Sequence, residues 1–192
     1  MELIFATHNA NKVKEIKSIL PAQLQIISLS EANIVEEIEE PFDTIEENSE
    51  TKAKFIFSNY SKNCFSEDTG LIVPSLNGEP GVKSARYAGE DANAEKNIKK
   101  LLHNLKDSSN RDAYFKTVIT LIIDGQQLQF IGICEGIIID TTIGNEGFGY
   151  DPIFVPNGST KTFAEMNLEE KNKFSHRKKA MAKLIDFLNT NF

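Results

Sequence analysis

Two long apolar stretches that meet at one tight turn are the sequence feature that most constrains this fold. The stretches cover residues 113–123 and 128–139, and both are rich in β-branched and aromatic residues. Asp124-Gly125 lies between them, and this dipeptide favours a two-residue turn that joins antiparallel strands. The pattern therefore predicts a hairpin of two long β-strands.

The start of the chain predicts a second kind of unit, in which a strand leads through a polar loop into a helix. Residues 3–6 are apolar, residues 7–11 are polar, and apolar residues then recur at helical spacing up to Leu20, where Pro21 ends the helix. An antiparallel hairpin together with this unit predicts a mixed sheet. Further strands are expected at 24–29, 64–66 and 153–155, and further helices at 44–60, at 93–105 and after Ser175.

These elements predict an α/β fold with a mixed twisted sheet, flanking helices and two lobes around a central cleft. The chain has 192 residues, of which 40% are hydrophobic, and it contains no repeat and no low-complexity segment. A chain of this length can bury a full core. We therefore expect a single domain that covers residues 1–192.

Cysteine usage and hydropathy indicate the compartment. Cys64 and Cys134 lie far apart, no hydrophobic leader precedes the first strand, and the sequence offers no disulfide framework. The longest apolar stretches, 117–123 and 125–134, are separated by Asp124 and are too short for a membrane span. We expect a cytoplasmic protein that does not insert into a membrane.

Charge is unevenly distributed along the chain. The net charge is −7, which argues against broad binding to a nucleic-acid polymer. Residues 31–50 hold nine acidic residues and no basic one, whereas residues 161–192 hold seven basic and four acidic residues. This pattern suits a site where carboxylates hold a cation and basic groups hold an anion, but a solvated acidic loop beside a basic helix has the same pattern.

A first candidate site lies between the first strand and the first helix. Backbone amides at a helix start attract phosphate, and here they accompany a hydroxyl, an amide side chain and Lys12. The alternative is that Asn9 or Asn11 caps the helix while Lys12 is solvated. No P-loop pattern is present.

A second candidate site is the pair Glu67-Asp68, which follows an apolar run. Carboxylates at the end of a strand suit Mg²⁺ or Mn²⁺. Neighbouring side chains on an extended backbone point to opposite faces, so we expect only one of the two, Asp68, to reach the site. Glu39 and Glu40 are candidates for a second carboxylate, with a solvated loop as the alternative.

A third candidate site is the glycine-flanked segment 147–152. Its glycines let a planar ligand approach the backbone, so that Phe148 can stack on a base and Asp151 can accept hydrogen bonds from it. The alternative is a turn with Tyr150 packed in the core, and for Tyr150 we prefer that reading.

A fourth candidate site lies at the first turn of the last helix. It comprises Ser175, His176 and Arg177, with Lys171 four residues before Ser175. Arg177 offers a planar fork of donors. A plain helix cap with exposed basic residues is the alternative.

Six segments along the chain match, in order, the motifs of one family. They are Thr7-x-Asn9-x-x-Lys12-x-x-Glu15, Glu47-Asn48, Glu67-Asp68-Thr69-Gly70, Pro80-Gly81-x-x-Ser84-Ala85-Arg86-Tyr87, residues 147–154 and Ser175-His176-Arg177. The set resembles the inosine triphosphate pyrophosphatase family, whose members remove ITP, dITP and XTP from the nucleotide pool. Three departures are visible: Glu67 replaces an Asp, Thr69 replaces a Ser, and His8 stands where many members have Gly.

The resemblance implies hydrolysis of a purine nucleoside triphosphate to the monophosphate and pyrophosphate, with Mg²⁺, in a homodimer. It assigns Asp68 to the metal and to activation of water, with Glu39 or Glu40 as a further metal ligand. A donor such as Arg177 that faces the 6-carbonyl of the base would disfavour adenine. The implied substrate-binding residues are Thr7, His8, Asn9, Ala10, Asn11, Lys12, Thr69, Phe148, Gly149, Tyr150, Asp151, Lys171, His176 and Arg177.

Two alternatives remain at this stage. One is a related pyrophosphatase of the Maf type, against which the segments at 148–151 and 175–177 argue. The other is a nucleotide-binding domain that has lost turnover, and Asp68 is the residue that discriminates it from an enzyme.

Overall fold

The computed structural model describes all 192 residues and divides the chain into two compact units. The chain crosses from one unit to the other four times. Three of these crossings lie inside the strands β3 (Cys64–Ile72), β5 (Asp112–Ile123) and β6 (Gln126–Ile138). The expected single domain over residues 1–192 stays a prediction. Unit 1 comprises Met1–Asp68, Thr117–Gly132 and Arg177–Phe192, and unit 2 comprises Thr69–Lys116 and Ile133–His176.

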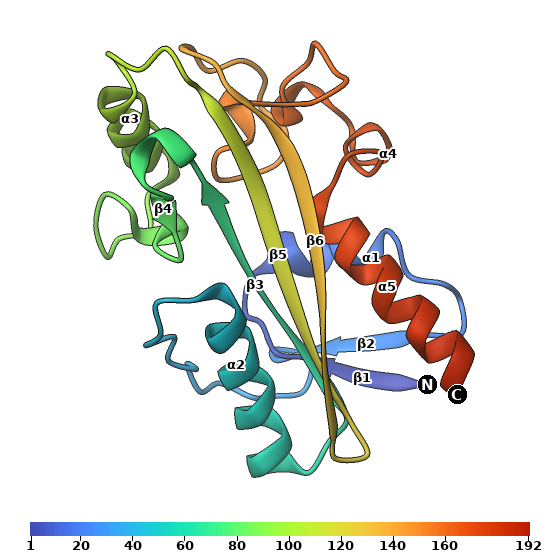
Figure 1. The fold of residues 1–192 in the computed structure, drawn as a ribbon. Helices are drawn as coiled ribbons and strands as arrows, with labels where there is room; N and C mark the ends of the chain where they lie inside the picture. Colours follow the sequence, from blue (N-terminus) through green and yellow to red (C-terminus); the bar gives the residue numbers. More distant parts are fainter. The chain divides into compact units, whose positions relative to one another are not determined.

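Unit 1 is built on parallel strand pairs. β1 (Glu2–Phe5) lies between β2 (Gln25–Ser28) and β3 and is parallel to both. β5 and β6 continue the order of strands beyond β3. In Figure 1, β1 is followed by the helix α1 (Ala10–Lys17), which confirms that the chain opens with a strand, loop and helix unit.

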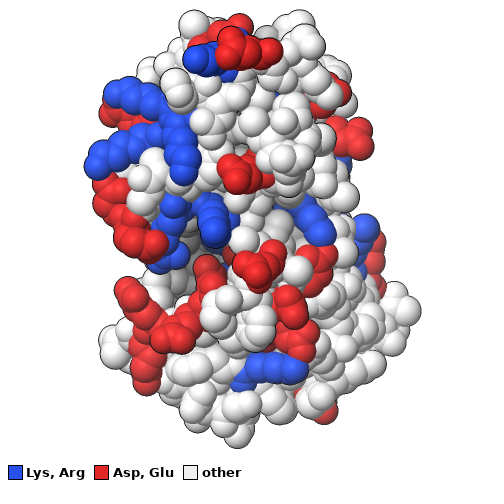
Figure 2. Space-filling view, turned by 60° about the vertical axis from the view of Figure 1, so that its left-hand side comes forward, with Lys and Arg blue, Asp and Glu red and all other residues white.

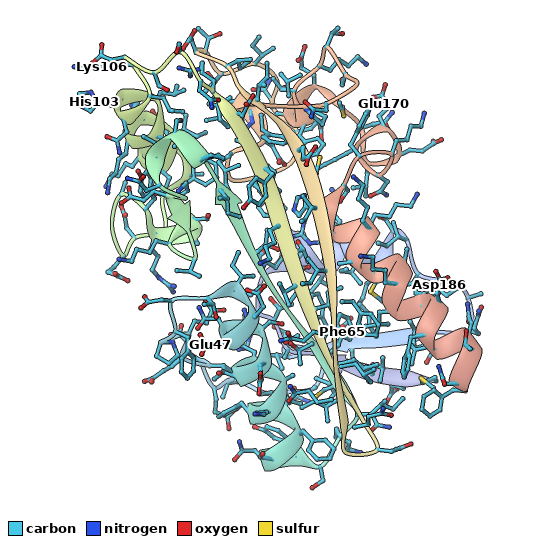
Figure 3. All side chains as sticks on the ribbon, in the orientation of Figure 1. Glu47, Phe65, His103, Lys106, Glu170 and Asp186 are labelled. Atoms are coloured by element: carbon cyan, nitrogen blue, oxygen red, sulfur yellow. The ribbon has the colours of Figure 1, made fainter.

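Two separate apolar clusters pack on the two faces of this sheet. Leu3 and Phe5 belong to the cluster that includes α1 (Ala10–Lys17) and α5 (His176–Asn191), whereas Ile4 belongs to the cluster that includes α2 (Ile45–Tyr60). Alternate residues of a strand point to opposite faces, which explains the division. Phe65, labelled in Figure 3, stacks on Phe5 with ring centroids 4.5 Å apart.

The ends of α2 follow from local chemistry. The hydroxyl oxygen of Thr44 accepts a hydrogen bond from the backbone N–H of Glu47, and the Thr44 hydroxyl donates to the Glu47 carboxylate. Glu47 is labelled at the start of this helix in Figure 3. Ser61 ends the helix in the left-handed conformation. The predicted helix at 44–60 is confirmed.

Unit 2 surrounds a single apolar cluster. α3 (Ala94–Asn104), capped by the Asn93 side chain, contributes Ile98 and Leu101 to it, and the predicted helix at 93–105 is confirmed. The short strands β4 (Pro80–Gly81) and β7 (Phe154–Pro156) pair antiparallel with β3 and β6, which confirms a mixed sheet. The remaining short helices are α4 (Leu168–Lys171) and the 3-10 turns Pro74–Leu76, Ser84–Arg86, Asp151–Ile153 and Phe163–Glu165.

The predicted hairpin is confirmed, but the predicted end of β3 is wrong. Asp124 and Gly125 have φ values of 49° and 81°, as this two-residue turn requires. β3 continues to Ile72, so Glu67 and Asp68 lie inside the strand and not after it. Buried partners on both faces of the strand neutralise these carboxylates, so their charge does not end it. The first helix also ends earlier than expected, at Lys17.

No helix of the chain is both long and apolar enough to cross a membrane. On the face displayed in Figure 2, acidic side chains gather in some patches and basic side chains in others. The basic patches of that face do not merge into one continuous basic surface.

Candidate active site

Glu67 and Asp68 point to opposite faces of β3, as the strand periodicity predicts. Glu67 forms an ion pair with Arg177 of α5, and Asp68 forms one with Lys52 of α2. Ser66, on the same face as Asp68, lies 3.0 Å from the hydroxyl of Ser49 on α2. Two adjacent carboxylates therefore serve two different clusters of charge.

The first cluster joins Asp68, Lys52 and Glu40. The Lys52 ammonium donates to Asp68 Oδ1 at 3.2 Å and also to the carboxylate of Glu40. Asp68 is 7% exposed, and burial raises its pKa although the neighbouring ammonium groups of Lys52 and Lys12 oppose the rise. Burial disfavours the ammonium of Lys52, but the two carboxylates outweigh this effect and raise its pKa. Lys52 therefore keeps its positive charge in a site with little solvent.

Helix α2 holds the acidic loop in place for this cluster. The Asn48 side chain donates to the carbonyl oxygen of Phe42 and accepts from its N–H, each at 2.9 Å. Lys52 lies one helical turn after Asn48 and therefore reaches Glu40, two residues before Phe42. Both glutamates are exposed to solvent, but Glu40 is the one that joins Asp68 through this lysine. The structure thus distinguishes two glutamates that the sequence left equivalent.

Lys52 is a member of the cluster that the sequence prediction missed. It lies seven residues after Ile45 and four before Ile56, both buried in the core. These spacings place Lys52 on the buried stripe of α2. A lysine on such a stripe needs a buried partner, and this signal was available in the sequence.

The second cluster joins Arg177, Glu67, Glu15 and Lys12. Arg177 donates through Nε and Nη2 to the two carboxylate oxygens of Glu67, at 2.6 and 2.7 Å, and through Nη1 to Glu15. Burial opposes its charge, but the two carboxylates outweigh burial and raise its pKa. Lys12 Nζ lies 3.4 Å from Glu67 Oε1, and burial lowers the pKa of Lys12 although Glu67 opposes the change. The contact that the family resemblance implies between Arg177 and the base stays a prediction.

The predicted phosphate-binding segment leads into α1 and includes its first residues. The side-chain oxygen of Asn9 accepts from the backbone N–H groups of Asn11 and Lys12, at 3.0 and 3.2 Å. Asn9 therefore caps the helix, as one reading proposed, but the Lys12 side chain is only 15% exposed and is not freely solvated. A ring nitrogen of His8 lies 3.1 Å from the carbonyl oxygen of Glu36. The predicted residues Thr7, His8, Asn9, Ala10, Asn11 and Lys12 thus lie together in unit 1.

In unit 2, a buried ion pair organises the predicted base-binding segment. Lys171 Nζ donates to Asp151 Oδ2 at 2.6 Å, and the backbone N–H of Phe148 donates to the same oxygen at 2.8 Å. The ammonium lies 5.2 Å from the centroid of the Phe148 ring, within the range of a cation–π contact. Gly147 has φ +73°, and a Cβ there would lie 2.0 Å from Asp151 Oδ2. This glycine lets the carboxylate fold back on its own loop.

Two further predicted residues of unit 2 pack in the core. Tyr150 is 4% exposed, and its hydroxyl donates to the carbonyl oxygen of Ser84 at 2.9 Å. Burial raises the pKa of this phenol. The preferred reading of Tyr150 as a core residue is confirmed. The His176 ring is also buried and stacks on Phe115, with centroids 4.7 Å apart.

The predicted residues therefore form three groups of charge. Unit 1 contains the cluster of Asp68 with Lys52 and Glu40 and the cluster of Arg177 with Lys12, and unit 2 contains the pair of Asp151 and Lys171. Thr69 is the first residue of unit 2. The cleft expected between two lobes, and the functional roles of these residues, stay predictions.

The residues around Asp68 fit the Mg²⁺ that the sequence predicts. The chain has no group of three or more His, Cys, Asp or Glu residues that is arranged to hold a metal ion. Mg²⁺, however, is usually bound by one or two carboxylates, with water and substrate phosphates as the other ligands. Asp68 and Glu40 already converge on one cation, the Lys52 ammonium. Their hard oxygen atoms are a suitable pair of donors.

Comparison with known protein families matches residues 3–187 to the Ham1 family. The chain belongs to the Ham1 family. The resemblance drawn from the six sequence segments is confirmed.

Similar proteins come from several bacteria. The chain is 54% identical over 188 residues to the dITP/XTP pyrophosphatase of Christiangramia forsetii, covering 98% of this chain and 99% of that protein. It is 44% identical over 191 residues to the dITP/XTP pyrophosphatase of Bacillus subtilis, covering 97% and 96% of the two chains. Similarity at this level extends over essentially the whole chain.

A solved Ham1 structure has the same fold. The Staphylococcus aureus Ham1 protein superposes with a TM-score of 0.90 at 38% identity and covers 100% of both chains. This agreement confirms the predicted α/β fold with a mixed sheet and flanking helices.

Proposed function

We propose that this Ham1 protein hydrolyses dITP, ITP and XTP to the nucleoside monophosphate and pyrophosphate. The observation that carries the proposal is the convergence of the Asp68 and Glu40 carboxylates on the ammonium of Lys52, beside the second cluster with its Lys12. A triphosphate brings several negative charges, so an acidic protein must supply cations where it binds. Similarity to dITP/XTP pyrophosphatases supports the choice of substrates.

Asp68 is the proposed general base. Its carboxylate takes a proton from the water that attacks the α-phosphorus, the bond between that phosphorus and the bridging oxygen breaks, and pyrophosphate leaves. Burial raises the pKa of Asp68, which makes the carboxylate a better proton acceptor, while Lys52 favours the ionised form. The reaction needs no protein nucleophile.

Asp68 and Glu40 are the proposed ligands of Mg²⁺. A bound Mg²⁺ neutralises phosphate charge and polarises the phosphoryl group that is attacked. Lys12 and the N-terminal amides of α1 are proposed to bind the phosphates, with Thr7, His8, Ala10 and Asn11 around them. Lys12 is held near Glu67, which Arg177 orients, so Arg177 supports the position of this ammonium.

Phe148, Gly149 and Asp151, with Lys171 and His176, form the proposed base-binding site, and Thr69 is a proposed substrate contact. Phe148 offers a ring for stacking, and Lys171 Nζ lies 5.2 Å from that ring as a candidate donor to a 6-carbonyl. Adenine has an amino group at that position, so two donors would face each other at a cost of about 1–3 kcal/mol. We therefore expect a preference for ITP over ATP of about tenfold to a hundredfold.

A nucleotide screen tests the proposal. Purified protein is incubated with ITP, dITP, XTP, ATP or GTP, with Mg²⁺ or with EDTA, and pyrophosphate and orthophosphate are measured separately. Pyrophosphate release from the first three, lost in EDTA, is the expected result. Nucleotide binding without turnover would favour a non-catalytic domain, and orthophosphate release would contradict the proposed bond cleavage. The homodimer that the resemblance implies and the cytoplasmic location that cysteine usage predicts are further predictions.

A further inference from the structure

Lys52 occupies the position between the two proposed metal ligands. Its ammonium binds Asp68 Oδ1 at 3.2 Å and also binds the carboxylate of Glu40. These two carboxylates come from segments 28 residues apart in the sequence, and the lysine joins them. An ammonium that binds both carboxylates uses oxygen atoms that a divalent cation would need.

We propose that Lys52 is a built-in competitor of the divalent cation: it holds Glu40 and Asp68 together in the metal-free protein and must leave both carboxylates when the metal binds. This inference rests on the proposed function, because it takes Asp68 and Glu40 as the metal ligands. It assigns Lys52 a positioning role that the proposed reaction does not include.

The chemistry of lysine suits an exchange of this kind. An ammonium is a compact charge on a flexible stem and makes no fixed planar contact, unlike the guanidinium of Arg177. The Lys52 side chain is 8% exposed, but the Glu40 side chain is 34% exposed, so one carboxylate of the cluster borders solvent. An incoming cation can therefore reach Glu40 before Asp68 is uncovered.

The competition has two electrostatic consequences. The positive charge of Lys52 opposes a second cation at the same carboxylates, so the metal binds more weakly than to an empty pair. Without metal, the same charge prevents two buried carboxylates from facing each other uncompensated. Removing the positive charge of Lys52 should therefore increase the affinity for metal and lower the stability of the metal-free protein.

The first test is direct Mn²⁺ binding without nucleotide, read from the electron paramagnetic resonance signal of free Mn²⁺. Lys52→Met should bind Mn²⁺ about tenfold or more tightly than the wild type. Its Tm should be lower without metal, and Mn²⁺ should raise that Tm more than it raises the wild-type Tm. Lys54→Met is the matched control, because Lys54 lies on the same helix but its side chain is 59% exposed and pairs with Glu50. The control should bind Mn²⁺ like the wild type.

Asp68→Asn separates this inference from the proposed metal site. Loss of Mn²⁺ binding in Asp68→Asn, together with equal, weaker or undetectable binding in Lys52→Met, overturns the competitor role but leaves the metal site in place. Unchanged Mn²⁺ binding in Asp68→Asn overturns the metal site and the inference with it.

A measurement on the wild type avoids any folding defect of the variants. The rate at which an acylating reagent modifies Lys52 is followed by mass spectrometry, with Lys54 as the internal reference. Mn²⁺ should increase the rate at Lys52 relative to Lys54, because the amine leaves its two carboxylates. An unchanged or lower relative rate would contradict the displacement.

Discussion

Glu67 and Asp68 are neighbours on β3, but each pairs with a different cation in a different geometry. Glu67 is fully buried, with both carboxylate oxygens held by the planar fork of Arg177. Asp68 is paired with the single ammonium of Lys52, which it shares with the partly exposed Glu40. The strand sends one carboxylate to each face of the sheet, and each face supplies a different cation.

We expect the partner, more than burial, to separate a structural carboxylate from a reactive one. A guanidinium satisfies a carboxylate in two fixed directions and leaves it little freedom. A lysine neutralises the charge through contacts that are not fixed in direction, so a carboxylate can exchange it for another ligand. We therefore expect Glu67 to affect stability and Asp68 to affect turnover, and the following predictions test that contrast.

The largest expected effect is the loss of turnover in Asp68→Asn. An amide cannot accept the proton of the attacking water, so kcat for dITP should fall by about 10³-fold to 10⁴-fold. The free energy of unfolding should change little, because an amide can still accept from Lys52. Pyrophosphate release and urea denaturation measure the two quantities. Near-normal turnover would remove Asp68 from the proposed reaction.

The complementary change is Glu67→Gln, which should mainly destabilise the fold. It leaves the buried Arg177 with one carboxylate fewer, and the NH2 group of Gln would face a guanidinium donor where Glu67 now accepts with both oxygens. The free energy of unfolding should therefore fall by about 3 kcal/mol. Urea denaturation measures this loss. A smaller loss than in Asp68→Asn would break the contrast between the two carboxylates.

A third prediction extends the contrast to the carboxylate of unit 2. In Gly147→Ala, the new Cβ would lie 2.0 Å from Asp151 Oδ2. The free energy of unfolding of this variant should therefore fall by about 3 kcal/mol or more. Gly149→Ala is the matched control, since Gly149 also has positive φ but no atom within 4 Å of such a Cβ. It should lose only the backbone cost of about 1–2 kcal/mol. Equal losses in thermal or urea unfolding would mean that Asp151 is free to move.

The smallest expected effect concerns Glu31, a carboxylate at the surface. Hydrogen bonds from Lys17 and Ser28 lower the pKa of Glu31 to about 2. Because the pKa is lowered on folding, the stabilisation is present above the ordinary value near 4.5 and is lost as pH falls toward 2. The difference in stability between wild type and Glu31→Gln should therefore shrink as pH is lowered from 6 to 3. A titration of the Glu31 carboxyl by NMR checks the pKa itself.

The sequence predicts well those features that depend on neighbouring residues. The helix at 44–60 and the turn at Asp124-Gly125 each follow from a few adjacent side chains, and both are confirmed. The opposite directions of Glu67 and Asp68 follow in the same way from the period of a strand.

The charge partners depend on contacts that the sequence does not display. Arg177 and Glu67 are 110 residues apart, and Lys52 and Asp68 are 16 residues apart on different elements. Because those partners cannot be read from the sequence, the sequence predicts that β3 ends before its two carboxylates, whereas the strand continues to Ile72. The choice between Glu39 and Glu40 likewise depends on how Asn48 holds the backbone of Phe42.

The chain crosses between its two units four times, and this has a consequence for proteolysis and for unfolding. Neither unit is a continuous stretch of sequence, so a protease that cuts once at any crossing leaves both units joined by the other three. Loss of structure in one unit also releases the strand ends that belong to the other. Calorimetry should therefore record one endotherm for the whole chain.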